Sequence, residues 1–161
     1  MEMPKPAEAH RKLARFAGRW TGMEKLSPSP WDPKGGPAVG RCNNRLAADG
    51  FVLVHDYEQE RGGTASFHGH GVFSYDSVEK CHMLHWWDSM GFGINVFNGQ
   101  FEGNTLKLLC KLPQGSTRGT WEFVDDSHYR FLMEVSPDGQ KWMMMIEGDF
   151  TREGEIVPGC T

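Results

Sequence analysis

The chain has 161 residues, with 17 Lys and Arg against 21 Asp and Glu, and therefore a formal net charge of −4. This length fits one domain, which we expect to span residues 1–161. The mild acidity excludes a general nucleic-acid binder, which needs a basic face to neutralise phosphates. No apolar run approaches the roughly 18 residues of a membrane span, so we expect neither nucleic acid nor a membrane among the partners.

The N-terminal residues 1–17 predict a short amphipathic helix, because Ala9, Leu13 and Phe16 fall on one stripe and Gly18 follows as a stop signal. The segment is charged and lacks the apolar core of a signal peptide, so we expect a cytoplasmic protein with reduced thiols. Residues 26–40 contain four Pro and three Gly and predict a long surface loop.

From residue 41 onward apolar and polar residues alternate, and turn signals recur about every 8–12 residues, a pattern typical of all-β proteins. The expected strands are 19–25, 41–48, 51–60, 64–75, 80–88, 93–97, 100–101, 105–111, 119–124, 128–135 and 141–151. Nearly every connection has hairpin length, which favours antiparallel pairing of consecutive strands. We expect about ten strands to close into a single up-and-down barrel, which leaves no exposed edge.

The tripeptide Gly18-Arg19-Trp20 follows the expected helix and opens the first strand. It resembles the G-x-W signature of lipocalins and related calycin barrels. The resemblance implies that an Arg of the last strand covers the Trp, and Arg152 is placed for that role. Such a cation–π contact would seal one end of the barrel.

Further blocks along the chain resemble a second, related family. They include Gly69–Gly71, Trp86–Gly91, Pro137–Gly139 and Phe150–Arg152. Their order and spacing resemble a mostly bacterial family catalogued as domain of unknown function 1579, which is lipocalin-like. The resemblance implies a calycin-like barrel with a short N-terminal helix and supplies no reaction.

Five of the seven histidines fall within 31 residues: His55, His68, His70, His82 and His85. We expect a two-residue turn at Gly62-Gly63 and a four-residue turn at residues 76–79. These turns pair the strands so that His55, His70 and His85 form one cross-strand row.

Tyr57, His68 and Trp87 form the next row on the same face. Acidic residues occupy the opposite face of the first of these strands, so we assign both rows to the barrel interior. By the same alternation His82 points to the surface.

Three neutral imidazoles at about 5 Å spacing on one face can converge on a cation and leave a fourth position open. His55, His70 and His85 are therefore candidate ligands of zinc or another divalent metal in an enzyme, with His68 or Tyr57 as acid or base. One of them could instead ligate a haem iron. Alternatively, the histidines hydrogen-bond one another in a polar interior.

The favoured hypothesis is a barrel that binds a small apolar or aromatic ligand. Strand alternation turns Phe131 and Met133 inward, and a four-residue loop at 136–139 would pair them with Met144 and Trp142. The expected ligand-binding residues are Tyr57, His68, Trp87, Phe131, Met133, Trp142 and Met144. A third possibility is a ligand-free scaffold that forms a homodimer through outward-facing Met143 and Met145.

Overall fold

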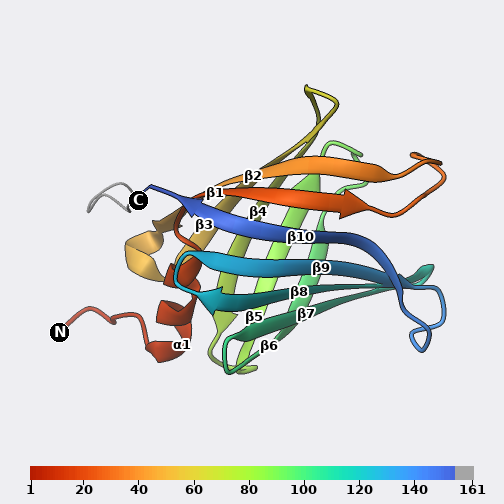
Figure 1. Ribbon diagram of the computed structural model, residues 1–161. Helices are drawn as coiled ribbons and strands as arrows, with labels where there is room; N and C mark the ends of the chain where they lie inside the picture. Colours follow the sequence, from red (N-terminus) through yellow and green to blue (C-terminus); the bar gives the residue numbers. More distant parts are fainter. Residues whose placement is uncertain (155–161) are drawn as a thin grey trace.

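A computed structural model describes residues 1–154 of the chain, and it contains a closed barrel of ten antiparallel strands. Each strand pairs with the next along the chain, and the last pairs with the first (Figure 1). The expected all-β, up-and-down barrel is confirmed. Within these residues no helix has the length and apolar character needed to cross a bilayer.

The elements follow the sequence in simple order. They are α1 (Glu8–Arg11), η1 (Lys12–Phe16), β1 (Gly18–Leu26), β2 (Gly36–Ala47), η2 (Ala48–Gly50), β3 (Val52–Arg61), β4 (Thr64–Asp76), β5 (Cys81–Asp88), β6 (Asn95–Glu102), β7 (Thr105–Leu112), β8 (Gly115–Asp125), β9 (His128–Ser136) and β10 (Met143–Glu153).

Several strand boundaries differ from the sequence-based expectation, including the start of β8, which is Gly115 instead of residue 119. The loop expected over 26–40 covers only residues 27–35, because β2 already pairs with β1 from Gly36. The segments 93–97 and 100–101 form the single strand β6, so the expected turn at Asn98-Gly99 is wrong. Gly99 lies in the ladder opposite Leu108, where a Cβ atom would be 1.9 Å from the carbonyl oxygen of Lys107. Gly99 therefore serves the close approach of two strand backbones and not a turn.

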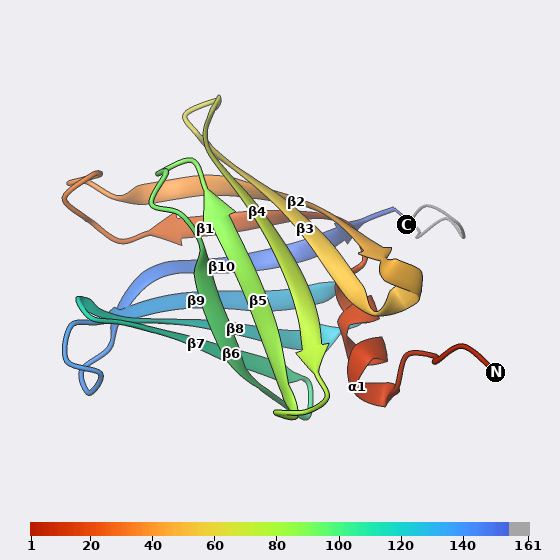
Figure 2. The ribbon, with the colours of Figure 1, turned by 180° about the vertical axis from the view of Figure 1, so that it is seen from behind.

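The N-terminal helical segment covers one end of the barrel (Figures 1 and 2). Leu13, Phe16 and Trp20 are each 1 % exposed. The indole Nε1 of Trp20 donates to the carbonyl oxygen of Phe16 at 2.9 Å. Arg152 lies with its guanidinium 4.3 Å from the centre of the Trp20 ring, where the G-x-W resemblance puts it. Its nitrogens also donate to backbone carbonyls of the helical segment, so this end is closed by packing and by hydrogen bonds.

A bulge in β4 changes which histidines enter the barrel. The Gly62-Gly63 turn pairs Arg61 with Thr64 as expected, but Ser66 is then passed over and Gln59 pairs with Phe67. Since side chains alternate along a strand, a shift of one residue exchanges the two faces. His68 and His70 therefore face outward, while His55 stays inside.

The β4–β5 pairing also differs from the expectation. Asp76 pairs with Cys81, so the turn covers residues 77–80, and the residue opposite His85 is Val72 instead of His70. The predicted row of three histidines is therefore wrong.

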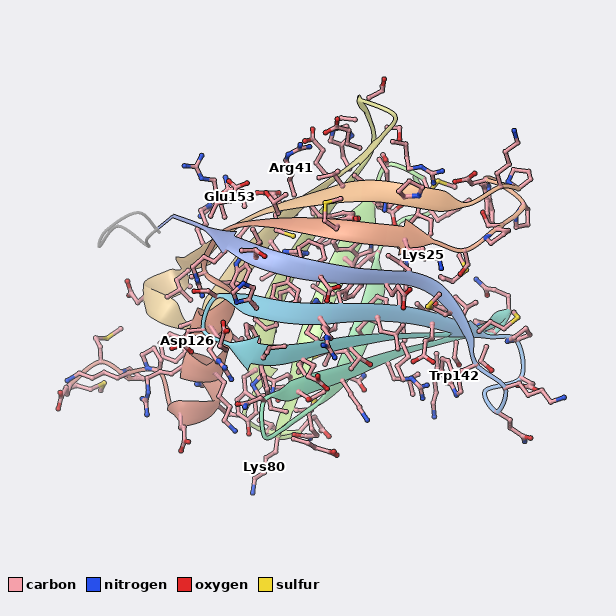
Figure 3. All side chains as sticks on the ribbon, viewed as in Figure 1. Lys25, Arg41, Lys80, Asp126, Trp142 and Glu153 are labelled. Atoms are coloured by element: carbon pink, nitrogen blue, oxygen red, sulfur yellow. The ribbon has the colours of Figure 1, made fainter. Side chains whose placement is uncertain are left out.

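A second bulge lies between β9 and β10. Met144 pairs with Glu134 and Ile146 pairs with Met133, which leaves Met145 between them. The expected pairings of Met133 with Trp142 and of Phe131 with Met144 are wrong, because the loop is longer than four residues. Trp142 lies in that loop, at the end of the barrel away from α1 (Figure 3).

Candidate functional site

The barrel encloses a cavity of about 150 Å³ between its two ends. Most of the wall is aromatic, with rings from β5, β8, β9 and β10 among others. Five of these rings belong to Trp86, Trp121, Tyr129, Phe131 and Phe150. A largely apolar cavity of roughly this volume admits a benzene-sized molecule. The space is therefore suited to one aromatic ring.

Glycines make room for the two tryptophans of the wall, from the neighbouring strand β4 for Trp86 and from the same strand, β8, for Trp121. A Cβ atom on Gly69 would lie 2.0 Å from Cη2 of Trp86, and one on Gly71 would lie 3.0 Å from the same indole. Gly119 has the same relation to Trp121, at 2.6 Å. Both indoles therefore lie along the wall of the barrel, which keeps the centre open.

Phe150 uses a third set of glycines. A Cβ atom on Gly22 would be 2.5 Å from this ring, and one on Gly148 would be 2.9 Å from it. The other face of Phe150 stacks on Tyr129, with ring centres 4.9 Å apart. The ring is held between the backbone and a second ring, which makes this part of the wall rigid.

The cavity opens away from the helical segment. Phe67, Met133 and Ile146 line it near the far ends of their strands and are partly exposed, in contrast to the fully buried residues at the closed end. Asp88 also lines this region and accepts a hydrogen bond from Trp86 Nε1 at 2.9 Å. The carboxylate of Asp88 therefore fixes the orientation of one wall.

His55 is the histidine that lines the cavity, and it is 8 % exposed. Its Nδ1 lies 2.7 Å from Oδ1 of Asn44, the residue opposite it on β2. The amide Nδ2 of Asn44 donates in turn to the carbonyl oxygen of Phe16 at 2.8 Å. Burial lowers the pKa of His55 to about 4, so the ring is neutral near pH 7.

A buried carboxyl group, that of Glu24, lies behind Tyr57, which lines the cavity. Glu24 is 4 % exposed, and its Oε1 accepts a hydrogen bond from the hydroxyl of Tyr57 at 2.6 Å. Gln59 Nε2 donates to that hydroxyl at 2.9 Å. The second oxygen of Glu24 has no hydrogen-bond partner among residues 1–154. Burial raises the pKa of Glu24, and the hydrogen bonds that its carboxyl accepts from Tyr57 and, at 3.5 Å, from Gln59 Nε2 only partly oppose that effect.

Glu24 was not among the residues expected at a site. Trp20, Gly22 and Glu24 share one face of β1, so the inward position of Trp20 implies that Glu24 also points inward. The alternation carried this signal, but a charged residue is usually assigned to the solvent side.

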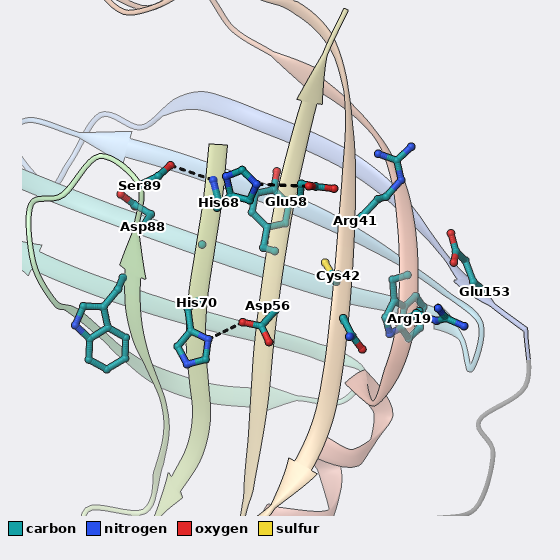
Figure 4. Close-up of a pocket in the computed structure, with 15 residues that line it drawn as sticks. Arg19, Arg41, Cys42, Asp56, Glu58, His68, His70, Asp88, Ser89 and Glu153 are labelled. Atoms are coloured by element: carbon teal, nitrogen blue, oxygen red, sulfur yellow. Dashed lines mark hydrogen bonds and ion pairs between the residues drawn. The ribbon is translucent and has the colours of Figure 1, made fainter. Parts of the chain in front are cut away.

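Two of the four histidines predicted inside, His68 and His70, line a groove on the outer face of β1 to β5, with a volume of about 760 Å³ (Figure 4). His70 Nδ1 lies 2.6 Å from Oδ1 of Asp56, and His68 Nε2 lies 3.5 Å from Oε1 of Glu58. Each pair joins neighbouring strands at an exposed position. Trp87 lines the same groove.

His82 also departs from the expectation. It is 3 % exposed, and its Nε2 lies 2.8 Å from the carbonyl oxygen of Ala9. The predicted surface position is wrong because the bulge exchanges the two faces of β4. Residues paired across β4 and β5 share a face, so the faces of β5 are exchanged as well and His82 points inward.

Three of the seven expected ligand-binding residues line the cavity: Tyr57, Phe131 and Met133. His68 and Trp87 lie in the outer groove. Trp142 packs against the guanidinium of Arg118 at 4.1 Å from its ring centre, and Met144 lies outside the lining.

The other candidate residues are also separated. His55, His70 and His85 do not converge, and in the described part of the chain no three His, Cys, Asp or Glu side chains are grouped to hold a metal ion. Met143 is 56 % exposed, whereas Met145 is half-buried.

Comparisons with known proteins bear on the fold. The family model described as "Protein of unknown function (DUF1579)" matches residues 5–152. The structure of Rv2717c from M. tuberculosis is similar with a TM-score of 0.69 at 14 % identity, over 92 % of this chain and 99 % of that one. The S-type phycobiliprotein lyase CPES from Guillardia theta gives a TM-score of 0.62 at 10 % identity, over 94 % of this chain and 100 % of that one. A comparison with curated proteins gives no match.

Proposed function

Because the chain belongs to the DUF1579 family and its barrel encloses an aromatic cavity, we propose that it binds a small, largely apolar ligand inside the barrel. The observation that carries the proposal is the cavity of about 150 Å³ whose wall is built of rings seated on glycines. Close packing leaves few voids larger than a water molecule in an ordinary core. A cavity of this size is therefore unusual for a core that only stabilises the fold, and it is explained if a ligand fills it.

The expected affinity follows from the size of the ligand. A single ring has six to eight non-hydrogen atoms, and the best very small ligands gain at most about 1.5 kcal/mol for each. That ceiling is already a net value, and a plain apolar ring in a cavity that opens at one end should fall well below it, at a net binding free energy of about 4–5.5 kcal/mol. We therefore expect a dissociation constant of about 0.1–1 mM for benzene or toluene.

The experiment is a titration of the purified chain with benzene, followed by NMR and by thermal unfolding. The indole N–H signals of Trp86 and Trp121 should shift, because both rings line the cavity. The melting temperature should rise with ligand concentration, since a molecule that binds only the folded chain stabilises it.

A matched pair of substitutions localises the binding. Met133→Trp fills the cavity and should abolish the rise in melting temperature, whereas Met143→Trp adds the same bulk at an exposed position and should leave it unchanged. Wild-type protein that shows neither indole shifts nor stabilisation at about 10 mM benzene, well above the expected dissociation constant, would overturn the proposal.

A further inference from the structure

The position of the proton on His55 can be read from its neighbours. The carbonyl oxygen of Phe16 can only accept, so the amide nitrogen of Asn44 must face it. The amide oxygen of Asn44 is then the atom that faces His55 Nδ1 at 2.7 Å. That oxygen also only accepts, so Nδ1 carries a proton and donates it.

The other ring nitrogen is consequently an acceptor. A neutral imidazole holds one proton, and in His55 it is placed on Nδ1. Nε2 therefore presents a lone pair. Since His55 lines the cavity, a group bound there can reach this lone pair.

The protein does not satisfy this acceptor with its own donors. Trp86, whose ring centre is 5.8 Å from that of His55, gives its indole N–H to Asp88. Tyr57, whose ring centre is 6.4 Å from that of His55, donates its hydroxyl hydrogen bond to Glu24. Within residues 1–154, Nε2 has no hydrogen-bond partner. The side-chain atoms that lack a partner and are also completely buried are Glu24 Oε2 and His82 Nδ1, so Nε2 keeps some accessible surface. Nε2 is open to the cavity.

We propose that the ligand of this barrel is a single aromatic ring that carries a hydroxyl or N–H group and donates it to His55 Nε2. Phenol is the smallest member of this class. The inference rests on the function proposed above and adds the polarity of the ligand. A ring without a donor leaves a buried acceptor unpaired, and such a group costs free energy that a donor would recover.

The test compares phenol with toluene, which has a similar shape and no donor. Dissociation constants are measured by calorimetry for wild-type protein and for His55→Phe. Hydration of the two free ligands is the same in both experiments, so it cancels in the change of their affinity ratio. We expect the preference for phenol over toluene to fall about tenfold in His55→Phe, which is the size of one net hydrogen bond.

A second measurement needs no substitution and covers the case in which His55→Phe does not fold. In wild-type protein with labelled histidine, the ¹⁵N resonance of the unprotonated His55 nitrogen should move upfield when phenol binds and stay in place with toluene. If both ligands bind without this difference and with an unchanged affinity ratio, the inference is wrong and the proposed function stands. If neither ligand binds, the proposed function itself fails.

Discussion

Glu24 shows, at the scale of a single residue, how the barrel interior tolerates a group that water would solvate better. Its carboxyl is buried, one oxygen is partnered by Tyr57 and Gln59, and the other has no partner among the described residues. Burial disfavours the charged form and raises the pKa of Glu24 above its ordinary value of 4.5. The folded chain therefore favours the neutral, protonated form of Glu24 more strongly than the unfolded chain does.

This predicts a pH-dependent effect of Glu24→Gln. The folded chain holds the Glu24 proton more tightly than the unfolded chain does, so the free energy of unfolding falls as pH rises above about 4.5. The glutamine does not titrate, so the difference in stability should move in favour of the variant between about pH 4.5 and pH 7. Urea unfolding at several pH values measures this difference, with exposed Glu122→Gln as the control. A difference that does not vary with pH would contradict the prediction.

At the scale of elements, β4 and β5 are joined by an indole that lies on glycine. Trp86 of β5 packs over Gly69 and Gly71 of β4. Its N–H is held by Asp88 of its own strand, so the ring has little freedom to move aside. The pairing of these strands and the width of the cavity therefore depend on the same contact.

A double-mutant cycle tests this contact. Gly69→Ala places a methyl group in the space of the Trp86 ring and should cost about 1–3 kcal/mol of unfolding free energy, as other overpacked sites do. In a Trp86→Phe background the same change should cost much less, because phenylalanine lacks the atoms at 2.0 and 2.2 Å. The coupling energy from urea unfolding of the four proteins gives the answer. Additive effects would mean that the ring already lies elsewhere.

At the scale of the whole molecule, the barrel has one sealed end and one accessible end. The seal is a short helical segment whose Phe16 ring packs against Phe73 of β4, Phe123 of β8 and Tyr129 of β9. The segment thus connects strands on different sides of the barrel. The cavity opens at the other end, so the cavity mouth and the seal lie at opposite ends of the barrel.

This arrangement predicts a large effect of Phe16→Ala. Removal of a buried ring that contacts several strands should lower the free energy of unfolding by about 3–5 kcal/mol. Phe92→Ala is the matched control, since Phe92 is 78 % exposed and its loss should change stability by less than about 0.5 kcal/mol. Urea unfolding followed by circular dichroism measures both. Equal effects would show that the seal does not stabilise the barrel.

The sequence by itself determined the order and the antiparallel connection of the strands, and their number apart from the break expected within β6, because alternation and turn chemistry are local properties of the chain. The tertiary structure alone decided which faces point inward beyond Ser66 and which residues of β9 and β10 are paired, since a bulge arises from the fit of two strands and leaves no distinct mark in either. For that reason the predicted row of histidines does not exist. His55 lines the cavity, whereas His70 faces outward and pairs with Asp56. The cavity depends likewise on rings that pack against glycines of a neighbouring strand, Trp86 over Gly69 and Phe150 over Gly22, and these contacts exist only once the strands have paired.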